Sequence, residues 1–155
     1  LIRAFNVLRQ YEEADFVPAY ERLAEHVLPG GLMIEGTSTP FGQLWSANLA
    51  RKVDALRGSW KMEALVFSTN FRLGFDVEEF QTILPKNYIH HVIKGEPIYD
   101  FFDAWKKSVA ETSAAKVYGL RQWFVASAES LGHKGFNINL QKKFLSKGWL
   151  IWEMT

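Results

Sequence analysis

The first 36 residues alternate between apolar runs of strand length and one stretch with helical spacing, and this alternation constrains the fold most. Residues 1–8 are almost continuously apolar, which is typical of a strand buried on both faces of a sheet. From Asp15 to residue 28, apolar side chains recur every three or four positions, as on one face of a helix. Residues 29–31, Pro-Gly-Gly, end that pattern, and residues 32–34 are again apolar. The sequence therefore predicts a strand, a helix and a second strand, the unit of a parallel sheet.

The rest of the chain also alternates between predicted helices and strands. We expect, in order, a helix over 41–56, a strand over 62–67, a short helix between Asp76 and Pro85, two helices within 97–131 that part near Thr112, and a final strand over 149–154. Residues 87–93 fit a strand or a helix equally well. No crossover follows the final strand, so we expect it to be antiparallel. These elements predict one α/β domain over residues 1–155, with helices on both faces of its sheet.

Composition excludes several classes of function. The 155 residues carry a formal net charge of +1, which provides no broad attraction to nucleic acid or anionic lipid. No cysteine is present, so disulfide frameworks, thiolate nucleophiles and cysteine zinc sites are excluded. The longest apolar runs fall far short of the ~20 residues that a membrane-spanning helix needs. We therefore expect a cytoplasmic protein that does not bind membranes. A small molecule as its substrate is a further expectation, which the charge of the chain does not set.

Two segments near the N-terminus carry a family resemblance. They are Leu-Ile-Arg-Ala-Phe-Asn-Val-Leu at 1–8 and Leu-Ala-Glu-His-Val-Leu-Pro-Gly-Gly-Leu-Met-Ile-Glu-Gly at 23–36. Their order and spacing resemble the fourth strand, the following helix and the fifth strand of class I S-adenosylmethionine-dependent methyltransferases. The match covers less than a quarter of the chain, and Pro-Gly-Gly before an apolar strand also occurs in unrelated α/β proteins.

The resemblance implies a partial Rossmann-like methyltransferase sheet, with equivalents of strands four to seven and an antiparallel last strand. Residues 41–56 would supply the fifth crossover helix. The family's glycine-rich turn and its ribose-binding acidic residue have no counterpart here, and would lie upstream of Leu1. The chain would then be the C-terminal portion of a methyltransferase domain truncated before residue 1. We expect S-adenosylmethionine to bind only together with the missing half.

The same resemblance implies roles for residues at the end of the first strand. Asn6 and Tyr11 are the candidate catalytic residues, since ligands of open α/β sheets bind at the carboxyl ends of strands. Ala4, Phe5 and Asn6 would contact the cofactor. Two alternatives remain open: Asn6 caps the adjoining loop through its own backbone, and Phe5 is a core residue.

Candidate substrate residues follow each of the first two strands. Gln10 lies in the loop after the first, and Glu35 and Thr37 lie at the end of the second, where their polar atoms can orient a substrate. A role in turn formation or helix capping explains Thr37 equally well. Arg9 fits a solvated loop better than a substrate contact.

Metal and nucleic-acid sites receive weaker support from the sequence. His90 and His91 are adjacent, so in a strand they point to opposite faces and do not easily share a metal ion. We predict no metal site. Lys134, Lys142, Lys143 and Lys147 lie near Trp149, a combination that can hold nucleic acid, but a solvated surface fits the nearly neutral chain better.

A non-catalytic function is the alternative to the methyltransferase hypothesis. An apolar first strand with an open edge invites pairing with another chain. The alternative function is therefore an α/β interaction or oligomerisation domain derived from a methyltransferase fold, which forms a homo-oligomer through this exposed sheet edge.

Overall fold

A computed structural model describes residues 1–53 and 60–154, and its centre is one five-stranded sheet. The strands follow each other in space as they do along the chain: β1 (Ile2–Phe5), β2 (Leu32–Ser38), β3 (Leu44–Lys52), β4 (Trp60–Thr69) and β5 (Trp149–Glu153). β1 and β2 are parallel, and every later pair is antiparallel. The predicted α/β class is confirmed, and the sheet is mixed, with the final strand antiparallel as expected.

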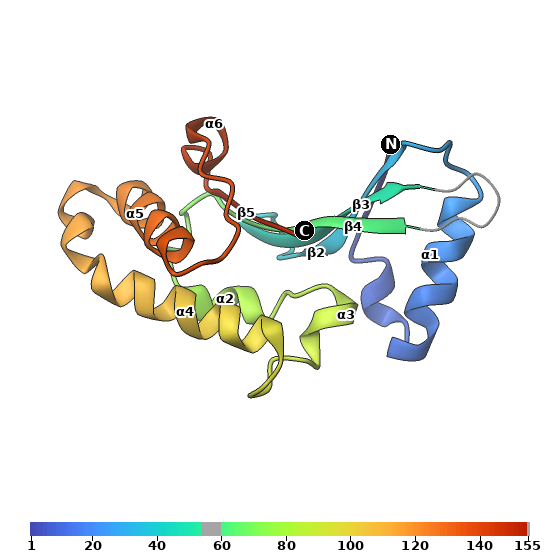
Figure 1. The fold of residues 1–155 in the computed structure, drawn as a ribbon, viewed down its shortest axis with the longest axis horizontal. Helices are drawn as coiled ribbons and strands as arrows, with labels where there is room; N and C mark the ends of the chain where they lie inside the picture. The colour runs from blue at the N-terminus through green and yellow to red at the C-terminus, as the bar shows by residue number, and fades with distance from the viewer. Residues whose placement is uncertain (54–59, 155) are drawn as a thin grey trace.

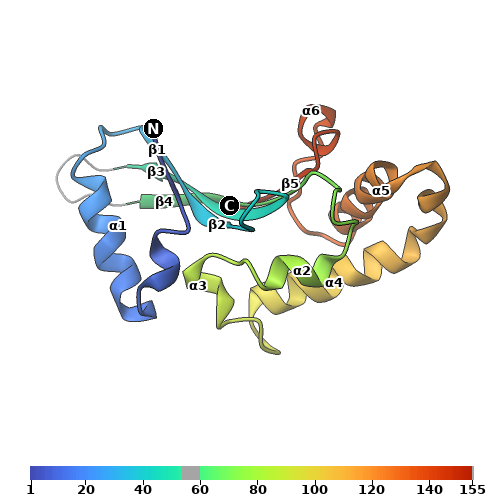
Figure 2. The same cartoon turned by 180° about the vertical axis from the view of Figure 1, so that it is seen from behind.

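Most of the helices lie on one face of this sheet. They and the short 3-10 segments are η1 (Leu8–Gln10), η2 (Glu13–Asp15), α1 (Phe16–Ala24), α2 (Val77–Gln81), α3 (Lys86–Ile89), α4 (Pro97–Glu111), η3 (Ser113–Tyr118), α5 (Leu120–His133) and α6 (Lys142–Leu145). Figures 1 and 2 show α1, α2, α3 and α4 along the same face, which we call the covered face. The opposite, open face carries only α6 among the described helices, near one end (Figure 1).

Several predicted elements are confirmed. The helix expected from Asp15 is α1, and the region 97–131 divides into α4 and α5, with η3 beginning after Thr112. Asp76 caps α2, because its carboxylate accepts a hydrogen bond of 2.9 Å from the Glu78 backbone N–H. The ambiguous segment 87–93 contributes residues 87–89 to α3.

The helix predicted over 41–56 is wrong, because this stretch forms β3; its residues 54–56 lie outside the described part. A five-residue loop, 39–43, turns the chain back, and the Thr39 N–H donates to the Leu44 carbonyl over 2.9 Å. β3 therefore pairs with β2 as a hairpin. Residues 41–53 therefore do not form the crossover helix implied by the resemblance, and in the part of the chain that the structure describes, long helices do not cover both faces.

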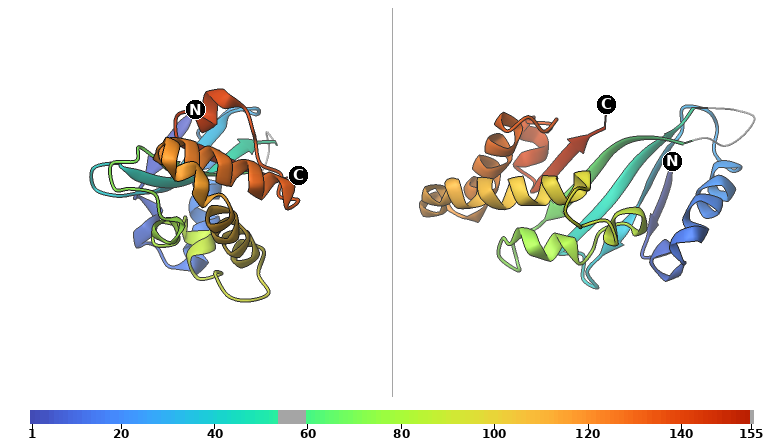
Figure 3. Two further views of the ribbon diagram at one scale, coloured as in Figure 1. Left: turned by 90° about the vertical axis from the view of Figure 1, so that its left-hand side faces the viewer. Right: turned by 60° about the horizontal axis from the view of Figure 1, so that its bottom comes forward.

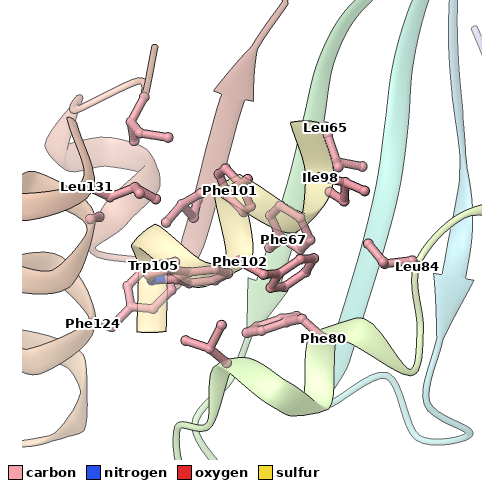
Figure 4. Close-up of a cluster of buried hydrophobic side chains, with 14 of the residues drawn as sticks. Leu65, Phe67, Phe80, Leu84, Ile98, Phe101, Phe102, Trp105, Phe124 and Leu131 are labelled. Carbon is pink, nitrogen blue, oxygen red and sulfur yellow. The ribbon is translucent and has the colours of Figure 1, made fainter. Parts of the chain in front are cut away.

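The larger core lies between β4, β5 and the helices of the covered face. The Phe67 ring is central: it lies 5.3–5.6 Å from the rings of Phe80, Phe101, Phe102 and Trp105 (Figure 4). All five of these side chains are fully buried. A second, smaller cluster forms beneath α1, from Leu8, Phe16, Tyr20, Met33 and Ala50. Figure 3 shows α1 and α5 at opposite ends of the sheet, so two apolar clusters share one face.

The hairpin of β2 and β3 contains a close backbone contact at Gly36. Gly36 is paired with Ala47, and a Cβ atom on Gly36 would lie 2.6 Å from the Ala47 Cα and closer still to the Ser46 carbonyl oxygen. Only glycine fits this position, because the obstructing atoms belong to the backbone of the neighbouring strand.

We predict that Gly36→Ala lowers the free energy of unfolding by about 3 kcal/mol, since β2 and β3 must separate to admit the methyl group. Gly132→Ala is the matched control. Its Cβ would meet only Leu140 side-chain carbons at 3.6 Å or more, so better helix propensity raises stability by up to about 1 kcal/mol. Urea denaturation followed by circular dichroism measures both. Equal stabilities of the two variants would contradict the account of Gly36.

Candidate functional site

Asn6 and Ser38 join the carboxyl ends of the two parallel strands. The Asn6 Nδ2 donates to the Ser38 Oγ over 3.1 Å, and the Ser38 backbone N–H donates to the Asn6 Oδ1 over 3.0 Å. Asn6 has a left-handed backbone, φ 61°, a conformation that asparagine tolerates better than most residues. Its side-chain amide is therefore engaged with the end of β2, rather than with its own loop.

A cavity of about 160 Å³ lies beside this junction. We call it the rim cavity; its lining residues are Arg9, Thr37, Leu84, Lys86, Ile89 and His90. They come from three separate places: η1 after β1, the end of β2, and the segment through α3. Thr37 is buried, whereas Arg9 and His90 are exposed. Three basic side chains and one hydroxyl thus meet at the carboxyl edge of the sheet.

A buried hydrogen-bond network lies on the same face, deeper along the strands. The Tyr20 hydroxyl donates to the Glu35 Oε2 over 2.8 Å, and the Asn48 Nδ2 lies 3.3 Å from that oxygen. The same Asn48 amide donates to the Asn87 Oδ1 over 2.9 Å. We call Tyr20, Glu35, Asn48 and Asn87 the polar seam, since it separates the two apolar clusters. It ties α1 and α3 to the sheet.

The polar seam holds a buried carboxyl group with no cation among its hydrogen-bond partners. Glu35 is 2% exposed, and burial raises its pKa above the ordinary value, although hydrogen bonds from Tyr20 and Asn48 oppose that rise. Burial also raises the pKa of Tyr20, and the nearby Glu35 charge adds to the effect. The Asn48 Oδ1 is buried without a hydrogen-bond partner among the described residues. Glu35 is therefore enclosed by the polar seam and lines neither the rim cavity nor the other cavity near β1.

A second cavity, of about 300 Å³, lies along the outer edge of β1. We call it the edge cavity; it is lined by Ala4, Val7, Leu8, Tyr11, Asp15, Pro18, Ala19, Arg22 and Leu23. Its volume is near the lower end of the range for ligand pockets. β1 pairs only with β2 among the described residues, so the edge cavity adjoins an unpaired strand edge. Two predicted residues, Ala4 and Tyr11, share this cavity.

The remaining predicted residues do not join either cavity. Phe5 lies on the open face, where its ring centroid is 5.7 Å from that of Trp45. Ala4 and Phe5 thus point to opposite faces, as neighbours in a strand do. Gln10 is exposed in η1. Of the substrate residues predicted, only Thr37 lines the rim cavity.

Sequence reasoning missed most of the polar seam and half of the rim cavity. Asn48 was hidden by the wrong helix over 41–56, although Ser46, Asn48 and Lys52 are polar and lie an even number of positions apart, as on one face of a strand. Lys86 lies next to the ambiguous segment 87–93. No local sequence pattern indicates that Lys86 lies near Arg9, because the two residues are 77 positions apart.

His91 and two of the lysines near Trp149 are engaged in contacts within the chain. The His91 Nε2 lies 2.7 Å from the Glu13 Oε1, an ion pair when His91 is protonated, and this contact raises the pKa of His91. Within residues 1–53 and 60–154, no three His, Asp or Glu side chains are grouped to hold a metal ion. Lys143 lies over the Phe144 ring and Lys147 over the Trp149 ring, so both pack on aromatic faces of this chain.

Comparison of the chain with family models, curated proteins and solved structures finds no match. In the described part of the chain, the helices are too short or too polar to cross a membrane.

The buried carboxyl of Glu35 predicts a pH-dependent stability. The folded state holds the Glu35 proton to a higher pH than the unfolded state, so stability falls as pH rises from the ordinary pKa of 4.5 through the raised one. We expect Glu35→Gln to remove this loss and to raise the free energy of unfolding at neutral pH by about 1 kcal/mol. The measurement is urea denaturation between about pH 4 and about pH 8.

Glu21→Gln is the control for the loss of one negative charge, because Glu21 is exposed on α1. We expect it to change the free energy of unfolding by less than about 0.5 kcal/mol. If wild type and Glu35→Gln give parallel pH profiles, Glu35 does not keep its proton in the folded state.

Proposed function

We propose that this chain supplies the substrate-side part of a class I S-adenosylmethionine-dependent methyltransferase. One observation carries the proposal: β1 and β2 are adjacent and parallel, α1 connects them, and polar residues of both meet at their carboxyl edge. In open α/β sheets, this edge is where ligands bind. The resemblance of residues 1–36 to the family's fourth and fifth strands points to the same edge.

The hairpin of β2 and β3 departs from the family pattern that the resemblance implies. Its loop and its second strand, residues 39–52, lie beyond the residues that carry the resemblance. The proposal therefore rests on β1, α1 and β2 and on the cavities around them. β3 and β4 support it only by holding β2 in place.

The described residues fit one wall of a cofactor site. Ala4 and Tyr11 line the edge cavity beside the unpaired edge of β1, where a neighbouring strand of a complete sheet would lie. The glycine-rich turn and the ribose-binding carboxylate have no counterpart in residues 1–155. When bound, S-adenosylmethionine supplies an electrophilic methyl group on its sulfonium.

The chain's own residues would act by positioning. Asn6 holds the end of β1 against Ser38, which fixes the strand that faces the cofactor. Thr37 and Arg9 would orient an acceptor from the rim cavity, and Tyr11 would close the edge cavity. A methyl transfer gains most from proximity and orientation, so no general acid or base is required of these residues.

The test is calorimetric titration of the protein, isolated with its native ends, with S-adenosylhomocysteine. Intact mass and N-terminal sequencing first establish whether residues precede Leu1. We expect saturable binding, and we expect Asn6→Ala to weaken binding or turnover about tenfold, because it removes two hydrogen bonds that fix the strand end.

Asn70→Ala is the matched control for Asn6→Ala. Asn70 is also exposed and bonds a local backbone N–H, that of Arg72, but it lies outside both cavities. The control should bind as wild type does. No binding of S-adenosylhomocysteine by the protein with its native ends would refute the methyltransferase proposal.

A second candidate function, a self-associating interaction domain, is favoured by the open face and the unpaired edge of β1. On the open face, the Trp45 ring lies between the rings of Phe5 and Trp149, 5.7 and 6.0 Å away. These three aromatic side chains remain partly exposed. An apolar face beside an open strand edge is a surface that a second copy of the chain can cover.

If this second function holds, light scattering coupled to size exclusion should give twice the monomer mass of 17.8 kDa. Phe5→Glu should restore the monomer, since it places a charge on the edge strand β1, within the aromatic cluster of the open face. Phe41→Glu is the matched control, because Phe41 is 88% exposed in the hairpin loop and should leave the dimer intact. A monomer at every concentration would exclude self-association.

A further inference from the structure

We propose that the rim cavity binds an oxyanion, the carboxylate or phosphate group of a small molecule. Arg9, Lys86 and His90 bring three nitrogen-bearing side chains to its lining, and no carboxylate side chain lines it. The proposal of an anion site in the rim cavity depends only on this arrangement of side chains. The identity of the bound molecule as the methyl acceptor rests on the proposed function.

Two basic side chains of the rim cavity have no carboxylate partner among the described residues that would compete with a ligand. Neither Arg9 nor Lys86 forms an ion pair with any residue in 1–53 or 60–154. The Glu13 Oε1 lies 2.7 Å from the His91 Nε2, and this contact, with smaller contributions from the charges of His90 and Lys86, lowers the pKa of the Glu13 carboxyl. Glu13 does not line the rim cavity, so the side chains that line it carry a net positive charge.

The size of the rim cavity suits a single anionic group. At roughly 30 Å³ for each water molecule, about 160 Å³ holds roughly five atoms of that size. A phosphate or carboxylate head group fits this space, with the rest of the ligand outside. Arginine binds both groups through paired N–H donors, and the Thr37 hydroxyl adds a donor from the floor of the cavity.

The walls of the rim cavity are held in place from several sides. Asn48 bonds Asn87 and so fixes α3 to β3, while the His91 contact with Glu13 fixes the end of α3 to η2. Leu84 is buried in the larger core, and Ile89 packs against it. Because Lys86 and His90 lie on this anchored segment, their backbone is held in place before a ligand arrives, which reduces the entropic cost of binding.

The experiment is a nuclear magnetic resonance titration of the full chain with inorganic phosphate and, separately, with acetate, at constant ionic strength. We expect saturable shifts of backbone amides around Thr37 and Lys86. Arg9→Gln and Lys86→Gln should each raise the Kd about tenfold, the scale of one lost charged hydrogen bond. The anion that binds more tightly identifies the head group as phosphate or carboxylate.

Two control variants make the same charge change away from the rim cavity. Arg72→Gln matches Arg9→Gln, and Lys94→Gln matches Lys86→Gln; both residues are exposed and line no part of it. They should leave the Kd within twofold of wild type. Equal weakening by the controls means general charge attraction and overturns the proposal, as does the absence of saturable binding for both anions.

The outcome is separable from that of the methyltransferase proposal. Anion binding without any affinity for S-adenosylhomocysteine would uphold the rim cavity and refute the methyltransferase. Binding of S-adenosylhomocysteine without anion binding would uphold the methyltransferase proposal and refute the anion site in the rim cavity.

Discussion

The antiparallel pairing of β2, β3 and β4 is the constraint on which the rest of the structure depends. Paired residues share a face, so Thr37, Ser46 and Phe67 lie in one row across the covered face, and Glu35, Asn48 and Leu65 lie in the next. Each row changes from polar at β2 to apolar at β4. The large core therefore forms over β4, and the polar groups gather over β2, next to β1. This gradient places the rim cavity at the carboxyl edge of the parallel pair.

The fold was predictable where one periodicity dominated. Residues 1–34 give a strand, a helix and a strand in both the prediction and the structure, and the helices within 97–131 were found with their break. The hairpin was missed because both faces of β3 are partly apolar, so Leu44, Trp45 and Leu49 fit a helical stripe as well as a strand. Gly42 within that stripe, at φ 69°, was the local sign of a turn.

The candidate site was predictable only in its β1 and β2 components. Asn6 and Thr37 follow directly from the ends of two apolar strands. Lys86 and His90 could not be placed, because no pattern within the sequence shows that α3 packs between the sheet and η2. Long-range hydrogen bonds such as that of Asn48 with Asn87 decide this packing, and they depend on tertiary structure alone.

Lys52, the last residue of β3, has a consequence for the stability of α1. Its buried ammonium donates to the carbonyl oxygens of Ala24 and Val27, over 2.5 and 2.6 Å, at the C-terminal end of α1. α1 has nine residues, too few for a helix to persist alone in water. The stability of α1 therefore depends on the hairpin, because the last residue of β3 supplies the positive charge that satisfies the carbonyl groups at the end of this helix.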